Sequence, residues 1–187
     1  MSDAKAAMRA RVRAAVAALT PQERRAAASR LTGALWQGEG PLAGLADAGG
    51  VLLGYMALAD EIDPRPAMRA WQEAGGRVAV PVTNWAARQM QAAVVGSLDD
   101  DAFERRDHGV LEPRNGRAAA AEDLAAVLVP GVAFDASGGR LGRGAGFYDR
   151  YLDTVACPTI GVCFVQQLVE RVVREPHDVE VAVVIGG

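Results

Sequence analysis

The chain has 187 residues, a formal net charge of −3 and 50% hydrophobic residues, while aromatic residues make up only 5%. This composition excludes a disordered chain and a core built from large rings. The length predicts one compact domain over residues 1–187. The slight acidic excess excludes a basic surface that coats nucleic acid.

The cysteine pattern and the hydropathy pattern point to a cytoplasmic protein. The two cysteines, Cys157 and Cys163, form neither a disulfide framework nor a zinc motif, and they fit a reducing compartment. No stretch approaches the roughly 18 apolar residues that a membrane span requires. Arginine and alanine alternate over residues 9–15, so a signal peptide is not expected either. We expect small-molecule partners, without nucleic acid or membrane.

The first two elements are predicted to be helices. Apolar residues recur at helical spacing over Ala4–Leu19. Thr20-Pro21-Gln22-Glu23 then supplies an N-cap, a first-turn proline and a glutamate that reaches back, so a second helix runs to about Trp36. A glycine-rich connector follows over residues 38–50.

The rest of the chain alternates between predicted strands and helices. Short apolar runs predict strands over Val51–Met56, Arg77–Pro81, Met90–Val95, Val127–Val129, Thr159–Phe164 and Val181–Ile185. Helices are expected over Ala67–Ala74, Arg117–Leu124 and Phe147–Leu152, and a loop over Asp99–Asp107. This alternation predicts an α/β fold with a mostly parallel sheet covered on both faces. Ligands in such folds bind beyond the carboxyl ends of the strands.

The sharpest local signal lies in residues 140–152. Three glycines, Gly142, Gly144 and Gly146, alternate directly before a predicted helix. Such glycines let the backbone approach an anion and turn N–H groups towards it, and the following helix adds unpaired N–H groups. The segment lacks the lysine of a P-loop and the third glycine of a dinucleotide fingerprint. On spacing alone, a phosphate site and an ordinary turn with solvated arginines remain equally open.

Charged residues near this segment and near the start of the chain add to the signal. Arg140 and Arg143 flank the glycines, and Asp149 lies where a carboxylate can hold Mg²⁺ beside phosphates. Lys5 is the only lysine among 20 basic residues, which suggests a need for a compact ammonium. At about 100° per residue it projects towards the apolar face of its helix, with Arg9 nearby. The alternative is a lysine that merely covers apolar surface at a frayed terminus.

The chain resembles the 5-formyltetrahydrofolate cyclo-ligase family. The central likeness lies in Val129–Asp135 and Arg140–Asp149. Further matches agree in order at Lys5–Arg9, Asp60–Ile62, Glu112-Pro113, Phe164 with Gln167–Val169, and His177–Val179. The likeness therefore spans nearly the whole chain. Two departures are Phe147, where the family usually has tyrosine, and Ala145, where it often has lysine or glycine.

The resemblance implies a three-layer α/β/α sandwich and a reaction. The reaction is the ATP- and Mg²⁺-dependent closure of 5-formyltetrahydrofolate to 5,10-methenyltetrahydrofolate, through phosphorylation of the formyl oxygen and attack by N10, with ADP and phosphate released. It implies catalytic roles for Lys5 and Arg143, and Mg²⁺ ligands at Asp149 and Asp178. The implied ATP contacts are Lys5, Arg9, Arg140, Leu141, Gly142, Arg143, Gly144, Ala145, Gly146, Phe147 and Tyr148. The implied folate contacts are Met56, Glu61, Arg143, Gly144, Ala145, Gly146 and Phe147. We expect a monomer or a weak homodimer.

Two alternatives remain open. The first is a related α/β enzyme that acts on a phosphorylated small molecule, but it leaves Lys5, Arg9 and Asp149 without a role. The second is a non-catalytic nucleotide-binding paralogue, which the retained Arg143 and Asp149 disfavour. An RNA-binding version of it is also disfavoured, because the chain is slightly acidic and lacks interleaved aromatic residues.

Overall fold

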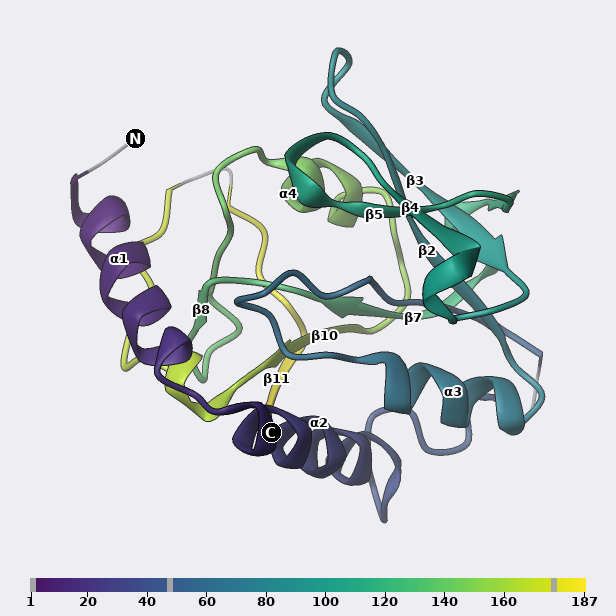
Figure 1. The fold of residues 1–187 in the computed structure, drawn as a ribbon, viewed down its shortest axis with the longest axis horizontal. Coiled ribbons are helices and arrows are strands. Elements are labelled where there is room, and N and C mark those ends of the chain that lie inside the picture. Colours follow the sequence, from purple (N-terminus) through teal and green to yellow (C-terminus); the bar gives the residue numbers. More distant parts are fainter. Residues whose placement is uncertain (1–2, 47–48, 176–177) are drawn as a thin grey trace.

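A computed structural model describes the chain except for residues 1–2, 47–48 and 176–177 (Figure 1). Its centre is a seven-stranded sheet with the order β11-β10-β7-β1-β2-β3-β6. The five strands from β11 to β2 are parallel, and β3 and β6 join antiparallel. The strands are β1 (Val51–Leu53), β2 (Arg77–Asn84), β3 (Gln89–Val95), β6 (Arg117–Ala119), β7 (Leu124–Val129), β10 (Thr159–Cys163) and β11 (Val183–Gly186). The mostly parallel sheet is therefore confirmed.

The described residues form four α-helices around the sheet: α1 (Asp3–Ala17), α2 (Pro21–Trp36), α3 (Arg65–Glu73) and α4 (Phe147–Leu152). The predicted cap of α2 is present, because the Thr20 hydroxyl accepts from the Glu23 N–H while the Glu23 carboxylate accepts from the Thr20 N–H. Short 3₁₀ turns are η2 (Asp100–Ala102), η3 (Asp107–Gly109), η4 (Ala121–Asp123) and η5 (Val165–Gln167). Two small ribbons pair β4 (Phe103–Arg105) with β5 (Leu111–Pro113), and β8 (Ala133–Phe134) with β9 (Arg140–Leu141).

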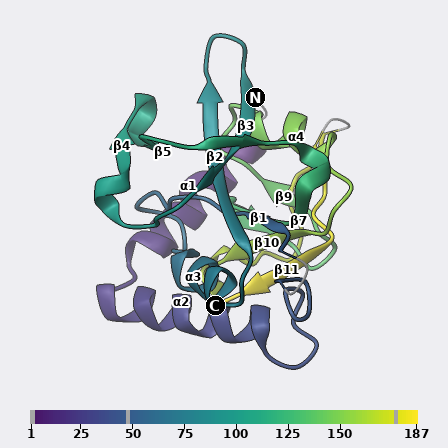
Figure 2. The ribbon, with the colours of Figure 1, turned by 90° about the vertical axis from the view of Figure 1, so that its right-hand side faces the viewer.

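The strands bury alternate side chains against two separate layers. Leu52 of β1 faces the core that contains Leu31 of α2 and Trp71 of α3, whereas Val51 and Leu53 face the opposite core, which α4 helps to cover. Figures 1 and 2 show α2 and α3 together on one side of the sheet and α4 on the other. Alternation along a strand requires apolar cover on both faces. The structure thus has the expected three layers.

Two local predictions were wrong. The alanine-rich stretch Arg117–Leu124 was expected to be helical, but it forms the edge strand β6, the turn η4 and the start of β7. Pairing of β6 with β3 overrides the helix propensity of alanine, because propensity is a weak local preference. The expected loop Asp99–Asp107 contains η2 and β4, since β4 pairs with β5.

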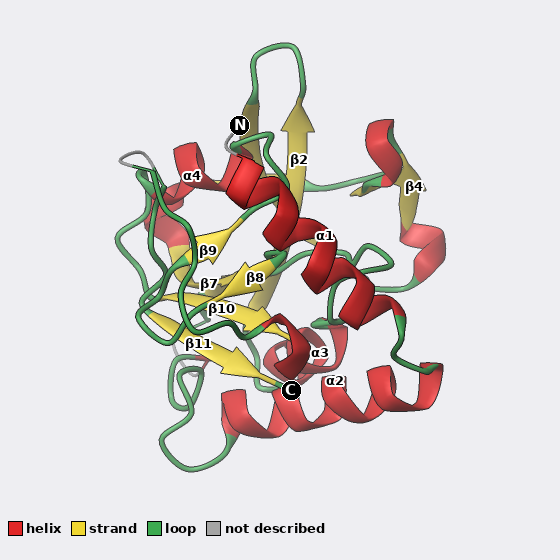
Figure 3. Cartoon of the chain, turned by 90° about the vertical axis from the view of Figure 1, so that its left-hand side faces the viewer, coloured by secondary structure: helices red, strands yellow, loops and turns green. Residues whose placement is uncertain are grey.

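Helix α1 lies at the edge of the molecule, across the β8–β9 ribbon (Figure 3). Its buried face consists of Lys5, Arg9, Val12 and Val16. Two cations on the buried side of a helix need compensating partners, because burying an unpaired charge is costly. Across the described ranges, no helix combines the length and the hydropathy needed to cross a bilayer.

Candidate functional site

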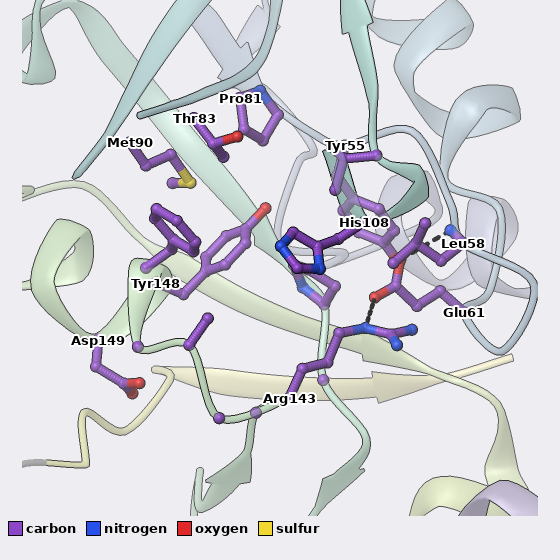
Figure 4. A pocket seen from close by; sticks show the side chains of 18 of the residues that line it. Tyr55, Leu58, Glu61, Pro81, Thr83, Met90, His108, Arg143, Tyr148 and Asp149 are labelled. Atoms are coloured by element: carbon purple, nitrogen blue, oxygen red, sulfur yellow. Dashed lines mark hydrogen bonds and ion pairs between the residues drawn. The ribbon is translucent and has the colours of Figure 1, made fainter. Parts of the chain in front are cut away.

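A cavity of about 500 Å³ opens where the parallel strands β1, β2 and β7 end. Three stretches of chain line it: the loop after β1, the end of β2 with the segment around η3, and the loop from β7 to α4 (Figure 4). This is the position at which α/β sheets bind ligands. The lining residues from the first two stretches are Tyr55, Met56, Leu58, Glu61, Pro81, Thr83, Trp85, His108, Val110 and Leu111, and β3 adds Met90.

The glycine segment forms one wall of this cavity. Its lining residues, together with the end of β7, are Pro130, Gly131, Arg140, Gly142, Arg143, Gly144, Ala145, Gly146, Phe147, Tyr148 and Asp149. Gly144 and Gly146 have φ of +104° and +70°, which favour glycine over residues with a Cβ. Leu141 alone of the predicted segment points elsewhere, because its side chain is buried in the core on the α1–α3 side. The segment therefore folds around a hollow and not as an ordinary solvated turn.

The two flanking arginines have different environments. Arg140 is buried, donates from Nη2 to Asp149 Oδ1 and from Nη1 to the Pro130 carbonyl, and lies 5.8 Å from the Tyr148 ring centroid. Arg143 lies at the mouth, where Nε donates to Glu61 Oε1 at 3.0 Å and Nη2 donates to Asp60. A guanidinium matches such paired carboxylates because its donors form a planar fork. The idea of two solvated arginines is thus wrong for Arg140.

Glu61 connects the loop after β1 to the glycine segment. Besides Arg143, its carboxylate accepts from the Leu58 N–H at 2.9 Å, which fixes the loop. Burial raises the pKa of Glu61, and the facing Arg143 partly offsets that rise. Met56 is buried beside it in the cavity wall. Met56 and Glu61, the two implied folate contacts outside the glycine segment, therefore line the same cavity as that segment.

The cations of α1 adjoin this site without lining the cavity. Arg9 Nε donates to the Gly142 carbonyl at 2.8 Å, so α1 contacts the glycine segment directly. Lys5, one turn earlier, donates to Asp178 Oδ2 at 2.6 Å and to Glu175 Oε2 at 2.9 Å. Burial lowers the pKa of Lys5, but hydrogen bonds to both carboxylates outweigh that effect and raise it overall. A frayed, solvated Lys5 is therefore excluded, since only 4% of the residue is exposed.

The two carboxylates implied as Mg²⁺ ligands are each held by a cation. Asp149 pairs with Arg140, and Asp178 pairs with Lys5. Within the described part of the chain, no cluster of three acidic, histidine or cysteine side chains is formed. Mg²⁺ bound with a nucleotide takes one or two protein carboxylates and completes its octahedron with phosphate oxygens and waters. Each of these carboxylates is an oxygen ligand of the kind that such a nucleotide-completed site uses.

Unpaired polar atoms concentrate at this site. Among the described residues, four buried side-chain atoms have no hydrogen-bond partner: Arg9 Nη1, Arg140 Nε, Tyr148 Oη and Trp85 Nε1. Three of these residues line the cavity, and Arg9 contacts the glycine segment. A buried unsatisfied polar group costs about 1–3 kcal/mol. The clustering therefore indicates a place where a polar ligand supplies the missing partners.

Sequence reasoning missed the aromatic wall opposite the glycine segment. The rings of Trp85 and His108 lie 3.9 Å apart between centroids, and Trp85 meets the Phe147 ring edge-on at 4.8 Å. Trp85 follows β2 in the projecting β2–β3 hairpin, and His108 lies in η3 with φ of +58°. Isolated aromatic residues in turns carry no motif, so spacing alone gave no signal.

Glu112, one of the matches in the family resemblance, has a defined structural role. It is buried in β5 and accepts from the Thr83 N–H at 2.8 Å and from the Thr83 hydroxyl at 2.5 Å. Thr83 itself lines the cavity. Glu112 therefore joins the β4–β5 ribbon to the cavity wall, and its match in the resemblance has a physical reason.

Comparison with known proteins gives a consistent result. The sequence model of the 5-formyltetrahydrofolate cyclo-ligase family matches residues 1–187. A protein of Mycolicibacterium smegmatis named 5-formyltetrahydrofolate cyclo-ligase is 33% identical over 145 residues, which cover 75% of each chain. A mouse protein of the same name is 24% identical over 138 residues, or 68% of each chain.

Solved structures agree with this assignment. The 5,10-methenyltetrahydrofolate synthetase of Aquifex aeolicus superposes with a TM-score of 0.80 and 27% identity, covering 97% of this chain and 89% of the other. A Mycoplasma pneumoniae protein described as a 5,10-methenyltetrahydrofolate synthetase has the same fold, with a TM-score of 0.75, 18% identity and 98% of both chains covered. The chain therefore belongs to the 5-formyltetrahydrofolate cyclo-ligase family.

Proposed function

We propose that this chain is an enzyme that converts 5-formyltetrahydrofolate into 5,10-methenyltetrahydrofolate, using ATP and Mg²⁺ and releasing ADP and phosphate. The observation that carries this proposal is the convergence of two distant segments on one cavity. The loop with Met56 and Glu61 meets the segment from Arg140 to Asp149 there. The match of the family over the whole chain supports the same reading.

The chemistry explains why ATP is needed. A formyl group on nitrogen is an amide, so resonance makes its carbon a poor electrophile. Its oxygen would also have to leave as oxide or hydroxide, both of which are poor leaving groups. In the proposed reaction the formyl oxygen attacks the γ-phosphorus of ATP, the bridging P–O bond breaks, and ADP leaves. N10 then attacks the formyl carbon, the C–O bond to the phosphorylated oxygen breaks, phosphate leaves, and N10 loses its proton.

The chain's own role in the first step is to position and neutralise phosphate oxygens. Phosphoryl transfer depends chiefly on alignment and on charge stabilisation. Arg9 and Arg140 each offer an unpaired N–H at the glycine segment, and Lys5 adds a buried ammonium one helical turn before Arg9. Arg143 lies between this side and Glu61. We assign the first three to ATP and Arg143 to the boundary between ATP and folate.

Asp149 and Asp178 would hold the magnesium ion, which when bound would neutralise charge on the phosphates. The present counter-ions of these carboxylates are Arg140 and Lys5, which are the cations assigned to phosphate. Each cation is therefore charge-balanced before a nucleotide arrives, and a phosphate can replace the carboxylate as its partner. This arrangement avoids leaving a buried charge unpaired in the free protein.

The part of the cavity that would bind folate needs a mostly apolar lining with a few polar groups. Met56 and Met90 supply flat, adaptable apolar surface there, and Glu61 supplies an acceptor.

A direct test follows the near-ultraviolet absorption of 5,10-methenyltetrahydrofolate. Purified protein with 5-formyltetrahydrofolate, ATP and Mg²⁺ is expected to produce the band, with one ADP and one phosphate formed per product molecule. Reactions without ATP, and reactions with a chelator of Mg²⁺, are expected to show no absorption band of 5,10-methenyltetrahydrofolate. A folded protein that binds ATP but gives no band would support the non-catalytic paralogue instead.

A further inference from the structure

Two tyrosines line the cavity, and their hydroxyls differ. The Tyr55 hydroxyl is buried and donates to the Ile62 carbonyl at 2.9 Å. The Tyr148 hydroxyl is also buried, yet no described residue pairs with it. Figure 4 shows the Tyr148 side chain directed into the cavity, in the part bounded by Thr83, His108 and Glu61. The free hydroxyl therefore faces the space that a ligand would fill.

The Tyr148 hydroxyl can act as a donor. A tyrosine is neutral at pH 7, and this hydroxyl is buried in the cavity wall without a partner among the described residues. A neutral phenol can donate a hydrogen bond, whereas an ionised carboxylate can only accept one. The cavity thus presents a donor hydroxyl and an acceptor carboxylate to one ligand. A ligand that satisfies both has an acceptor atom next to an N–H.

The pterin ring of a folate carries that pattern, because its cyclic amide has a carbonyl oxygen adjacent to a ring N–H. We propose that the Tyr148 hydroxyl donates a hydrogen bond to this carbonyl while Glu61 accepts from the adjacent N–H. This inference rests on the proposed function and moves Tyr148 from the nucleotide side, where the family resemblance puts it, to the folate side. Tyr148 would then be a residue that selects the substrate.

The Tyr148 ring packs against the side chain of Arg140. The Arg140 guanidinium lies 5.8 Å from the ring centroid, and Arg140 is itself held by Asp149. A cation within about 6 Å of an aromatic ring attracts it, so this contact favours the observed orientation of the Tyr148 side chain. The contact therefore lowers the cost of ordering Tyr148 when a ligand binds.

The test compares three tyrosine-to-phenylalanine variants. Binding of 5-formyltetrahydrofolate is measured by titration calorimetry in the presence of Mg²⁺ and a non-hydrolysable ATP analogue, and Tm is measured separately. Tyr148→Phe is expected to raise the folate Kd about tenfold, with the Kd of the ATP analogue unchanged and Tm unchanged or higher. Tyr55→Phe is expected to lower Tm, because it loses a buried hydrogen bond. Tyr151→Phe, on the same helix but outside the cavity, is expected to change neither affinity.

A second measurement identifies the atom that Tyr148 contacts. With a folate analogue that lacks the pterin carbonyl, the penalty of Tyr148→Phe is expected to vanish. The inference is overturned if Tyr148→Phe binds folate normally, if it weakens only the ATP analogue, or if its penalty persists with the carbonyl-free analogue. A wild-type protein that binds no folate would remove the proposed function itself and this inference with it.

Discussion

Lys5 and Asp178 form an ion pair with 2.6 Å between Nζ and Oδ2, although 173 positions separate them in the sequence. The contact joins the first turn of α1 to the segment before β11. The Arg140–Asp149 pair repeats the arrangement within the glycine segment. In both pairs a cation assigned to ATP is the counter-ion of a carboxylate assigned to Mg²⁺. In the free protein each of these cations therefore already has a carboxylate partner, which a phosphate would replace in the proposed nucleotide complex.

The first prediction concerns Lys5→Ala. We expect KM for ATP to rise at least tenfold, since a buried phosphate-binding ammonium is lost. Unfolding free energy should also fall by about 1–3 kcal/mol, because Asp178 loses a partner in a largely buried position. A solvated terminal lysine would affect neither quantity. Steady-state kinetics and denaturant unfolding measure the two effects.

The matched control is Arg11→Ala, which removes an exposed cation from the same helix and should change neither quantity by more than a small amount. If folded Lys5→Ala used ATP as well as the wild type does, Lys5 would serve only to hold the segment that contains Asp178.

Local signals in the sequence predicted most of the fold. The capping residues of α2, the bounds of α4 and the parallel strands follow from short-range patterns that tertiary contacts reinforce. One exception is Arg117–Ala119, an alanine-rich stretch that becomes the edge strand β6 because it pairs with β3, Gln89–Val95, whose partner residues lie 23 or more positions earlier. Local propensity cannot register such a pairing.

The site was predictable only where residues occur as motifs. The glycine segment and Lys5–Arg9 stand out in the sequence, and the structure brings both together at Gly142. Trp85 and His108 are single residues in turns, and their stacking depends on the placement of the β2–β3 hairpin. Glu175 likewise belongs to no sequence motif, and only the structure shows that it contacts Lys5.

The second prediction concerns Arg143→Lys. A lysine keeps the charge but cannot reach Asp60 and Glu61 with two donors at once. We expect kcat/KM to fall at least tenfold, which corresponds to about 1.4 kcal/mol of transition-state stabilisation. Arg69→Lys alters an exposed ion pair with Asp99 outside the cavity and should leave the kinetics unchanged. Equal kinetics for both variants would show that charge at position 143 is sufficient.

The third prediction separates backbone strain from function by comparing two glycines. Gly144 in the cavity wall has φ of +104°, and Gly75 at the end of α3 has φ of +90° with open space around it. Replacing either by alanine should cost about 1 kcal/mol of stability, because a Cβ disfavours positive φ. Only Gly144→Ala should also reduce activity. If the two variants lost activity equally, the geometry of the glycine segment would have no special role.

The fourth prediction concerns acid stability and Asp135. Burial alone raises the pKa of its carboxyl, but hydrogen bonds from Val172, Ser137, Gly139 and Arg174 outweigh this and hold the pKa below its ordinary value of 3.8. A carboxyl with a lowered folded-state pKa contributes stability above the unfolded value and loses it as the pH falls further. The wild type should therefore lose stability below about pH 4.

Asp135→Asn tests this assignment, because asparagine keeps one carbonyl acceptor but does not titrate. At pH 7 the variant should be about 2–3 kcal/mol less stable than the wild type, and this difference should shrink as the pH falls from 4 to 2. Asp101→Asn, at an exposed position, should follow the wild-type curve throughout. Urea unfolding across the pH range measures both variants. Parallel curves for Asp135→Asn and the wild type would mean that other carboxyls govern acid unfolding. If the stability curves of Asp135→Asn and the wild type converge as the pH falls, Asp135 is the group that joins the turn before Arg140 to the segment before Glu175.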